Sequence, residues 1–205
     1  MKILLVPKVI TRYKNQIEFL IEDNLILFLK KTFKDCWIDI AYDLIFKKET
    51  DLIILSGGNT IKKYSNKTED LVRSKYDNFY LKQSIRYKIP LIGICHGAQF
   101  IASKNNSKFK KDKEHIGYSH SIIGLNKKLV KNFTNVICYH NYKIISCGKQ
   151  ITSIAEAEDK SIEAFLLKIE KIAGIVWHPE RSKRNLNYQS NFFKKVYAFI
   201  SSSIR

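Results

Sequence analysis

One stretch of the sequence organises the rest: Pro90-Leu91-Ile92-Gly93-Ile94-Cys95-His96-Gly97-Ala98-Gln99-Phe100-Ile101-Ala102. Residues 90–94 are apolar and indicate a buried strand, and helical spacing follows them. The Gly-x-Cys-x-Gly between these parts is typical of a sharp strand-to-helix turn that presents a nucleophile. Glycines suit such a turn because neighbouring backbone leaves no room for a Cβ atom. The stretch predicts that Cys95 is a nucleophile at a helix N-terminus, where partial positive charge favours thiolate. A buried packing cysteine is the alternative that this stretch alone leaves open.

Length and composition restrict the class of protein. The 205 residues are 45% hydrophobic and 12% aromatic, which suits a single domain, residues 1–205, with a substantial core. No apolar window is long enough to cross a bilayer and the first residues do not resemble a signal peptide, so no membrane association is expected. The four cysteines form no CxxC pair, which favours a reducing, cytoplasmic location.

The formal net charge of +17 comes from 36 basic and 19 acidic residues. Such a charge fits either a nucleic-acid surface or an anionic small ligand. The lysines are scattered singly and in pairs, without an arginine stripe or a basic motif interleaved with aromatic residues. We therefore expect no nucleic-acid partner and favour a small substrate that carries phosphate. A lysine-rich proteome, or a non-catalytic basic binding protein, would also explain the charge.

Strands and helices are expected to alternate in the first half of the chain. Short apolar runs predict strands, and helical spacing predicts helices. The strands are expected at 2–6, 37–41, 51–55 and 90–94, and the helices at 14–31 and 71–88. This alternation indicates βαβ units and a mostly parallel sheet covered by helices. Ligands then bind beyond the carboxyl ends of the strands, where both Gly57-Gly58 and Cys95 are expected.

The pattern changes after residue 103. Residues 104–114 are polar and predict a loop, and residues 115–123 predict an edge strand or hairpin. Short alternating runs follow at 135–139, 144–147, 151–157, 162–167 and 172–177. Their spacing favours a mixed or antiparallel extension of the sheet. A closing helix is predicted at 190–200, with Phe199 among its inward-facing residues.

A cysteine nucleophile requires a general base close in space and a third group that orients this base. Of the five histidines, His178 is the best candidate because, like Cys95, it ends a predicted buried strand. Pro179 stiffens the following turn, so that His178 and Glu180 can point the same way. A Cys95–His178–Glu180 triad is therefore predicted, although spacing alone is a weak signal because any strand-end histidine could qualify.

Four motifs, in order along the chain, resemble those of class I glutamine amidotransferases. They are Leu55-Ser56-Gly57-Gly58, Gly93-Ile94-Cys95-His96-Gly97-Ala98-Gln99, the segment 155–164, and Gly174-Ile175-Val176-Trp177-His178-Pro179-Glu180. Together they span about residues 51–180. The resemblance implies the fold of that family, which is a flavodoxin-like α/β fold. Its mostly parallel central sheet has helices on both faces and a small antiparallel extension.

The resemblance also implies a reaction. Cys95 attacks a γ-glutamyl carbonyl with the help of His178, while Glu180 orients the imidazole. A γ-glutamyl thioester forms, the amine leaves, and water releases glutamate. The oxyanion would be held by the backbone N–H groups of Gly58 and His96. Neither a cofactor nor a metal is implied.

Further residues are carried over as substrate-binding candidates. Gln99 matches the family glutamine that reads the α-amino and α-carboxylate end of the substrate. Cys138-Tyr139-His140-Asn141-Tyr142 is similar to the Ser-Tyr-His-His-Gln segment of the γ-glutamyl hydrolase branch, which makes Tyr139, His140 and Asn141 candidates for the glutamyl pocket. A purely structural strand end is the alternative for these three. Gly57 and Asn59 are candidates through the Gly-Gly-Asn-Thr segment, in which Thr60 departs from the aspartate of the branch.

Two roles within the family use this chemistry. A glutaminase component delivers ammonia to a partner synthase, whereas a stand-alone hydrolase releases a larger amine. The Gly-Gly-Asn-Thr and Tyr-His-Asn segments favour the γ-glutamyl hydrolase branch. The size and motifs look similar to enzymes of bacterial capsule phosphoramidate biosynthesis. This implies a nucleotide-linked substrate, γ-glutamyl-CDP-amidate, cleaved to glutamate and cytidine diphosphoramidate. A synthase partner stays open but is not favoured.

Overall fold

The structure, a computed structural model, describes residues 1–13, 16–112, 116–167 and 170–202. Its strands form one eleven-stranded sheet and a separate two-stranded hairpin. The sheet contains β1 (Lys2–Val6), β4 (Trp37–Ile40), β5 (Leu52–Leu55), β6 (Leu91–Ile94), β7 (Lys108–Lys111), β8 (Ile116–Gly124), β9 (Phe133–Tyr139), β10 (Tyr142–Ser146), β11 (Ile151–Glu156), β12 (Ile162–Leu167) and β13 (Ile172–Ile175). The hairpin is β2 (Lys8–Arg12) and β3 (Gln16–Leu20), and the α-helices are α1 (Asp23–Thr32), α2 (Thr68–Tyr87), α3 (His96–Lys104) and α4 (Leu186–Ser202).

One half of the large sheet is parallel. Its strands run in the order β4-β1-β5-β6-β13, and each neighbouring pair is parallel. This is the flavodoxin-like order, in which ligands bind beyond the carboxyl ends of the strands. The strands β5, β6 and β13 are neighbours, so the segments that follow them meet at one edge. The predicted fold class is confirmed.

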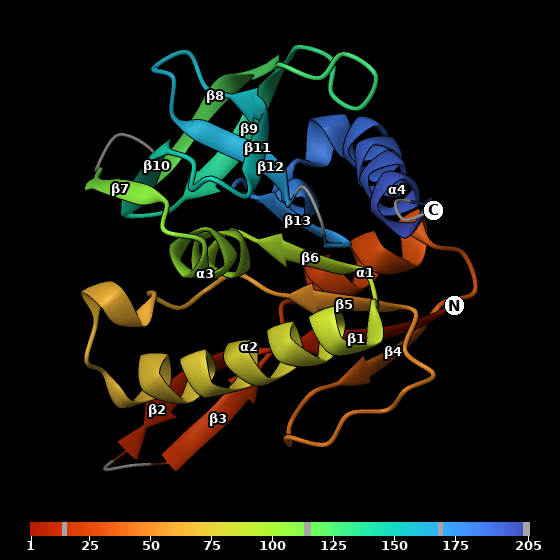
Figure 1. The fold of residues 1–205 in the computed structure, drawn as a ribbon, viewed down its shortest axis with the longest axis vertical. Helices are drawn as coiled ribbons and strands as arrows, with labels where there is room; N and C mark the ends of the chain where they lie inside the picture. Colours follow the sequence, from red (N-terminus) through yellow and green to blue (C-terminus); the bar gives the residue numbers. More distant parts are fainter. Residues whose placement is uncertain (14–15, 113–115, 168–169, 203–205) are drawn as a thin grey trace.

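The other half is antiparallel. Strand β12 pairs antiparallel with β13, and the sheet continues through β11 and β8 to β9. Strand β10 leaves this path and pairs with both β12 and β7. In Figure 1 these strands lie together beyond β13, away from the parallel half. The predicted antiparallel extension is therefore present, and it carries the Tyr139-His140-Asn141 segment next to the parallel strands.

Helices cover both faces of the parallel half. Helices α1 and α4 pack against one another on one face, while α2 and α3 cover the other (Figure 1). Each face has its own apolar core, with Phe28 and Phe193 in the first and Tyr80 and Phe100 in the second. Both faces of β5 and β6 are thus buried, which explains their continuous apolar sequences. No helix among the described residues has the length and apolar character needed to cross a membrane.

The predicted helix at 14–31 is wrong in its first half. Residues 16–20 form strand β3, which pairs antiparallel with β2, and helix α1 begins only at Asp23. The apolar positions that suggested a helix also suit a strand that packs one side against α2, where Phe19 contacts the Tyr76 ring at 5.2 Å between centroids. Ile17 lies on the same side of the strand as Phe19 and is 38% exposed. Residues 14–15 lie outside the described part.

Three smaller expectations are also corrected. The predicted loop at 104–114 contains strand β7, because its backbone pairs with β10 despite its lysines. Of the two expectations for residues 115–123, the hairpin is present because β8 pairs antiparallel with the next strand, β9, but β8 lies between β11 and β9 and so is not an edge strand. His115 falls outside the described residues. The closing helix is longer than predicted, and Phe199 is 43% exposed, since only one side of α4 faces the core.

Candidate active site

The turn between β6 and α3 has the strained geometry that the sequence predicts. Cys95 adopts φ 49° and ψ −101°, in the left-handed region that costs a non-glycine residue energy. A Cβ atom at Gly93 would lie 2.5 Å from the carbonyl carbon of Gly97, and one at Gly97 would lie 2.3 Å from the Leu55 oxygen. Both contacts are with backbone, which cannot move aside cheaply. The glycines are therefore required for the turn that presents Cys95 at the N-terminus of α3.

Cys95, His178 and Glu180 lie together at this edge. His178 follows β13, and its backbone N–H donates to the carbonyl oxygen of Ile137 at 3.0 Å. Its Nδ1 is 2.6 Å from Oε1 of Glu180, which lies in the short 3₁₀ helix Pro179–Arg181. The other ring nitrogen, Nε2, is left for Cys95, and both side chains lie against the same side of Gly57. The three side chains thus lie near one another, in the order that a nucleophile, its base and an orienting carboxylate require.

The electrostatics of this group favour an ion pair. Burial acts to raise the pKa of Cys95, but the charge and hydrogen bond of His178, aided by His140, outweigh it and hold that pKa below its ordinary value. Burial acts to lower the pKa of His178, but Cys95 and Glu180 raise it to about 10. The neutral thiol and imidazole are therefore disfavoured relative to thiolate and imidazolium. A thiolate is the nucleophilic form of cysteine.

Gly57 lies beside both the Cys95 and the His178 side chains. A Cβ atom built on it would be 2.7 Å from Cε1 of His178 and 3.3 Å from Cβ of Cys95. Gly57 is one of the expected substrate-binding residues, and it lines a small pocket beside His178. The absence of a side chain at this position leaves the space in which Cys95 and His178 face each other.

Gly57→Ala is expected to lower kcat/KM for amide hydrolysis by about 10²-fold, because the added methyl group must displace the His178 ring, and a displacement of this size can have such an effect. Steady-state kinetics and thermal unfolding of the purified variant check this. An unchanged rate in a folded variant would show that the His178 position is not critical.

The two proposed oxyanion donors flank Cys95. Gly58 has φ +110°, a conformation that favours glycine, and a Cβ atom there would lie 2.5 Å from Cδ of Lys8. His96 is the first residue of α3, where an N–H has no acceptor within the helix. Among the described residues, neither N–H has a backbone acceptor. Both are therefore available to a ligand.

A cavity of about 250 Å³ opens over Cys95. The predicted site residues that line it are Gly58, Asn59, Cys95, Gln99, Tyr139, His140, Asn141 and His178. The structure thus brings together residues from separate segments of the chain. This volume suits a small substrate.

Some of the predicted substrate-binding side chains already form hydrogen bonds with other residues of the protein. The Gln99 side chain donates from Nε2 to the Tyr142 oxygen at 2.7 Å, which leaves its Oε1 for a ligand. The Asn59 side chain bonds to the backbone of Val9 and to Asp70, so it holds the loop and presents only its remaining surface to the cavity. His140 is buried, and Glu163 and Cys95 outweigh the effect of its burial, so its pKa is raised.

Five cavity residues lie outside the predicted set: Lys8, Glu22, Thr60, Tyr142 and Arg181. Lys8 lines the cavity beside Gly58, and Glu22 and Arg181 form an ion pair at its rim, with Nε of Arg181 3.0 Å from Oε2 of Glu22. The Arg181 guanidinium also lies over the Tyr139 ring, 4.5 Å from its centroid. Lys8 follows the carboxyl end of β1, and this position in a parallel sheet is the signal that could have found it.

A second polar cluster lies behind Cys95. His120 Nε2 is 3.1 Å from Sγ of Cys138, and Cys138 Sγ is 3.7 Å from Oε2 of buried Glu163. In the part of the chain that the structure describes, these three side chains are close enough together to hold a metal ion. Their hydrogen bonds to one another also account for the arrangement, and burial together with Glu163 raises the pKa of Cys138 well above its usual value.

Comparisons with known proteins show the family of the chain. Residues 20–196 match the family described as glutamine amidotransferase class-I. A gamma-glutamyl-CDP-amidate hydrolase of Campylobacter jejuni is 36% identical over 167 residues, which cover 80% of each chain. A glutamine-hydrolyzing GMP synthase subunit from Picrophilus torridus is 30% identical over 156 residues, covering 71% of this chain and 74% of that one.

The fold has a counterpart among solved structures. A glutamine amidotransferase from Thermotoga maritima superimposes with a TM-score of 0.72 over 98% of both chains, although only 14% of the residues are identical. This likeness supports the arrangement of the sheet and its helices.

Proposed function

The chain belongs to the class I glutamine amidotransferase family, and on this basis we propose that it is a cysteine-dependent γ-glutamyl hydrolase with Cys95, His178 and Glu180 as its catalytic triad. The observation that carries the proposal is the approach of Cys95 and His178 across Gly57, with Glu180 on the far side of the imidazole. The lowered pKa of Cys95 and the raised pKa of His178 support a thiolate that is ready to attack.

The reaction proceeds in two halves. The Cys95 thiolate attacks the γ-carbonyl carbon, and the oxyanion is held by the N–H groups of Gly58 and His96. The tetrahedral intermediate collapses, the C–N bond breaks, and the His178 imidazolium gives its proton to the leaving amine. Neutral His178 then takes a proton from water as it attacks the γ-glutamyl thioester. Glutamate leaves, and the thiolate–imidazolium pair is restored.

The acyl group is proposed to be glutamyl. Gln99 lies one helical turn beyond Cys95 and lines the cavity, with Oε1 free to accept from an α-ammonium group. Tyr139, His140 and Asn141 close the same cavity from the antiparallel half of the sheet. These residues are proposed to read the α-amino and α-carboxylate groups of the substrate.

The amine that leaves is proposed to be a nucleotide-linked phosphoramidate, so that the substrate is γ-glutamyl-CDP-amidate and the product is cytidine diphosphoramidate. The support is the 36% identity to the Campylobacter jejuni hydrolase over most of both chains. Lys8 at the cavity adds a positive charge near the position of the leaving group, which suits a diphosphate. The net charge of +17 favours the approach of an anionic substrate.

A substrate panel tests this proposal. The purified chain is incubated with L-glutamine, with γ-glutamyl-GABA, and with γ-glutamyl-CDP-amidate, and glutamate release is followed. We expect kcat/KM for the nucleotide substrate to exceed the others by about 10²-fold, as lost polar contacts commonly give discrimination of this order or more. Comparable turnover of all three would overturn the nucleotide assignment. No turnover of any would overturn γ-glutamyl hydrolysis itself.

A glutaminase that delivers ammonia to a synthase is the second candidate. It is favoured by the match to the Picrophilus torridus GMP synthase subunit, which spans most of both chains. This role predicts slow glutamine turnover by the isolated chain and faster turnover when a synthase partner binds. Rapid hydrolysis of γ-glutamyl-CDP-amidate by the isolated chain would argue against it.

We propose that residues 1–205 act as a single cytoplasmic domain whose partner is a small molecule. The continuous sheet from β4 to β9 supports a single domain, and the lack of any CxxC pair in the sequence supports a reducing compartment. Neither a nucleic acid nor a membrane enters the proposed reaction.

A further inference from the structure

Helix α2 carries a stripe of buried charge. Asp70, Arg73 and Asp77 are three and four residues apart, which places them on one face of the helix. Their exposed fractions are 3%, 0% and 0%. Buried charges are costly unless they are paired and hydrogen-bonded. The contacts of this stripe therefore show what it holds in position.

Arg73 and Asp70 of this stripe form hydrogen bonds with the two ends of the loop 56–60. Arg73 donates to the Ser56 backbone oxygen at 2.7 Å and to its Oγ at 3.3 Å. Asp70 Oδ1 accepts from the backbone N–H of Thr60 at 2.9 Å and from Nδ2 of Asn59 at 3.0 Å. Gly57 and Gly58 lie between these anchored ends and have no side chain of their own to hold them.

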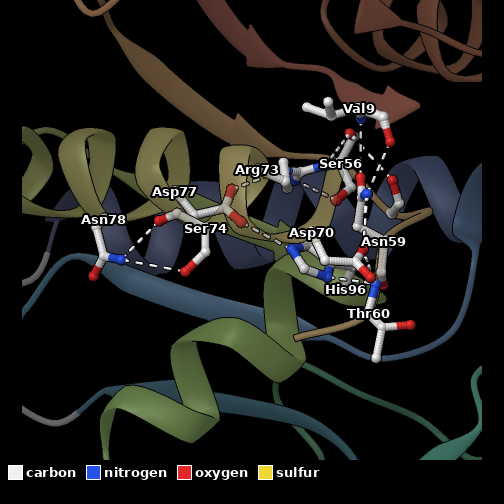
Figure 2. A network of polar contacts seen from close by, with 11 residues as sticks. Val9, Ser56, Asn59, Thr60, Asp70, Arg73, Ser74, Asp77, Asn78 and His96 are labelled. Carbon is white, nitrogen blue, oxygen red and sulfur yellow. Dashed lines mark hydrogen bonds and ion pairs between the residues drawn. The ribbon is translucent and has the colours of Figure 1, made fainter. Parts of the chain in front are cut away.

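His96 joins this loop to the nucleophile turn (Figure 2). Its Nδ1 is 2.8 Å from the Asn59 backbone oxygen, and its Nε2 is 2.8 Å from Oδ2 of Asp77. Both neighbours are hydrogen-bond acceptors, so both ring nitrogens donate only when the imidazole is protonated. Asp77 in turn accepts from Nε of Arg73 at 2.8 Å. The result is a continuous chain of bonds from Ser56 through Arg73, Asp77 and His96 to Asn59.

Asp77 is the acceptor that Arg73 and His96 share. Burial acts to raise the pKa of Asp77, but the charge of Arg73 and the hydrogen bond and charge of His96 outweigh it, so that the pKa lies below its ordinary value. Ionised Asp77 thus stands between the Arg73 guanidinium and the His96 ring. The arrangement holds the His96 ring rigidly against the loop.

We propose that His96, Asp77 and Arg73 are positioning residues that fix the distance between the backbone N–H groups of Gly58 and His96, and so preorganise the oxyanion hole. The inference rests on the proposed acyl-transfer function. The His96 side chain ties the loop that carries the Gly58 N–H to the residue that carries the second N–H. Preorganised donors act without reorganisation during the reaction, and removal of one donor lowers kcat by about 10²–10³-fold in a well-studied case.

Two variants of His96 separate its two contacts. In His96→Asn the side-chain amide replaces Nδ1 and can still donate to the Asn59 oxygen. In His96→Gln the amide replaces Nε2 and keeps only the contact with Asp77. Asn78→Ala is the matched control, because Asn78 lies on α2 but its side chain bonds to Ser74, one turn earlier on the same helix (Figure 2).

Two reactions of Cys95 provide the readout. Alkylation by iodoacetamide requires the thiolate but forms no oxyanion. Acylation by p-nitrophenyl acetate forms an oxyanion but does not require recognition of a glutamyl group. Each rate is corrected for the background that Cys95→Ala shows. A residue that merely supports the fold would change both reactions together.

We expect His96→Gln to slow acylation by about 30-fold. This is less than the effect of removing an oxyanion donor altogether, because the Gly58 N–H is displaced but still present. Alkylation by iodoacetamide should stay within about 3-fold of the rate of the unsubstituted protein. His96→Asn should recover most of the acylation rate, and Asn78→Ala should change neither reaction. On a γ-glutamyl substrate, His96→Gln should lower kcat more than it changes KM.

Parallel loss of both reactions, no loss of either, or no recovery in His96→Asn would overturn the proposal. If the unsubstituted protein reacts with p-nitrophenyl acetate but releases no glutamate from any γ-glutamyl substrate, the proposed function is wrong. The acylation and alkylation rates of the His96 variants would still test the positioning role. The two failures are therefore distinguishable.

Discussion

Replacement of Cys95 by alanine is expected to abolish glutamate release, lowering kcat by about 10⁴-fold or more, because removal of a nucleophile eliminates the covalent route. The variant should fold normally, since alanine is smaller than cysteine and the turn depends on its neighbouring glycines. Glutamate release from each γ-glutamyl substrate and thermal unfolding are the two measurements.

Cys36→Ala is the matched control. Cys36 precedes β4, so it lies at the amino end of that strand, whereas Cys95 lies beyond the carboxyl end of β6. Its thiol contacts the Leu29 oxygen at 3.8 Å and is remote from the chemistry. Full activity of Cys36→Ala together with loss of activity in Cys95→Ala would locate the nucleophile. Surviving glutamate release in Cys95→Ala would show that the triad is misassigned.

The second large effect is expected at His178. His178→Gln should lower kcat/KM by about 10³-fold, since general acid–base catalysis contributes about 10²–10⁴-fold. It should also remove the main interaction that lowers the pKa of Cys95. Burial then dominates and raises that pKa, so alkylation of Cys95 at neutral pH should become slower and increase only at higher pH. The pH dependence of the iodoacetamide rate measures this directly.

Glu180→Gln refines the same prediction. Activity requires thiolate at Cys95 and imidazolium at His178, so it should rise with pH through the lowered pKa of Cys95 and fall through the pKa of His178 near 10. Loss of the Glu180 charge removes one cause of that high pKa. The alkaline limb of kcat/KM should therefore move to lower pH in Glu180→Gln. An unmoved alkaline limb would contradict the orienting role of Glu180.

Much of this fold could be predicted because its strongest signals are local. The turn at Cys95 depends on Gly93 and Gly97, whose need for close backbone contact is visible in the sequence. Strands β5 and β6 are buried on both faces, which produces continuous apolar runs. The hairpin β2–β3 could not be predicted, for the opposite reason. Over a few residues, Ile17 and Leu20 fit a helical period while Ile17 and Phe19 fit a strand, and the pairing with β2 that decides between them is not local.

Some residues of the site could likewise be predicted from the sequence, and others could not. Residues at strand ends could be predicted from the topology, and the structure brings Cys95 and His178 together as expected. The buried stripe on α2 could not be predicted, because Asp70, Arg73 and Asp77 at helical spacing look like an exposed charged face. Only the tertiary contact with the loop 56–60 shows that they are buried and engaged. Lys8, by contrast, could have been found from its position after the carboxyl end of β1, which pairs in parallel with β5.

Detection of the acyl-enzyme is the most direct test of the account. The protein is mixed with γ-glutamyl-CDP-amidate, quenched in acid within the first turnovers, and digested for mass spectrometry. We predict that the peptide containing Cys95 gains the mass of one γ-glutamyl group, that hydroxylamine removes this group as a hydroxamate, and that Cys95→Ala shows no adduct. Glutamate release without an adduct on Cys95, or an adduct on another residue, would contradict the thioester mechanism.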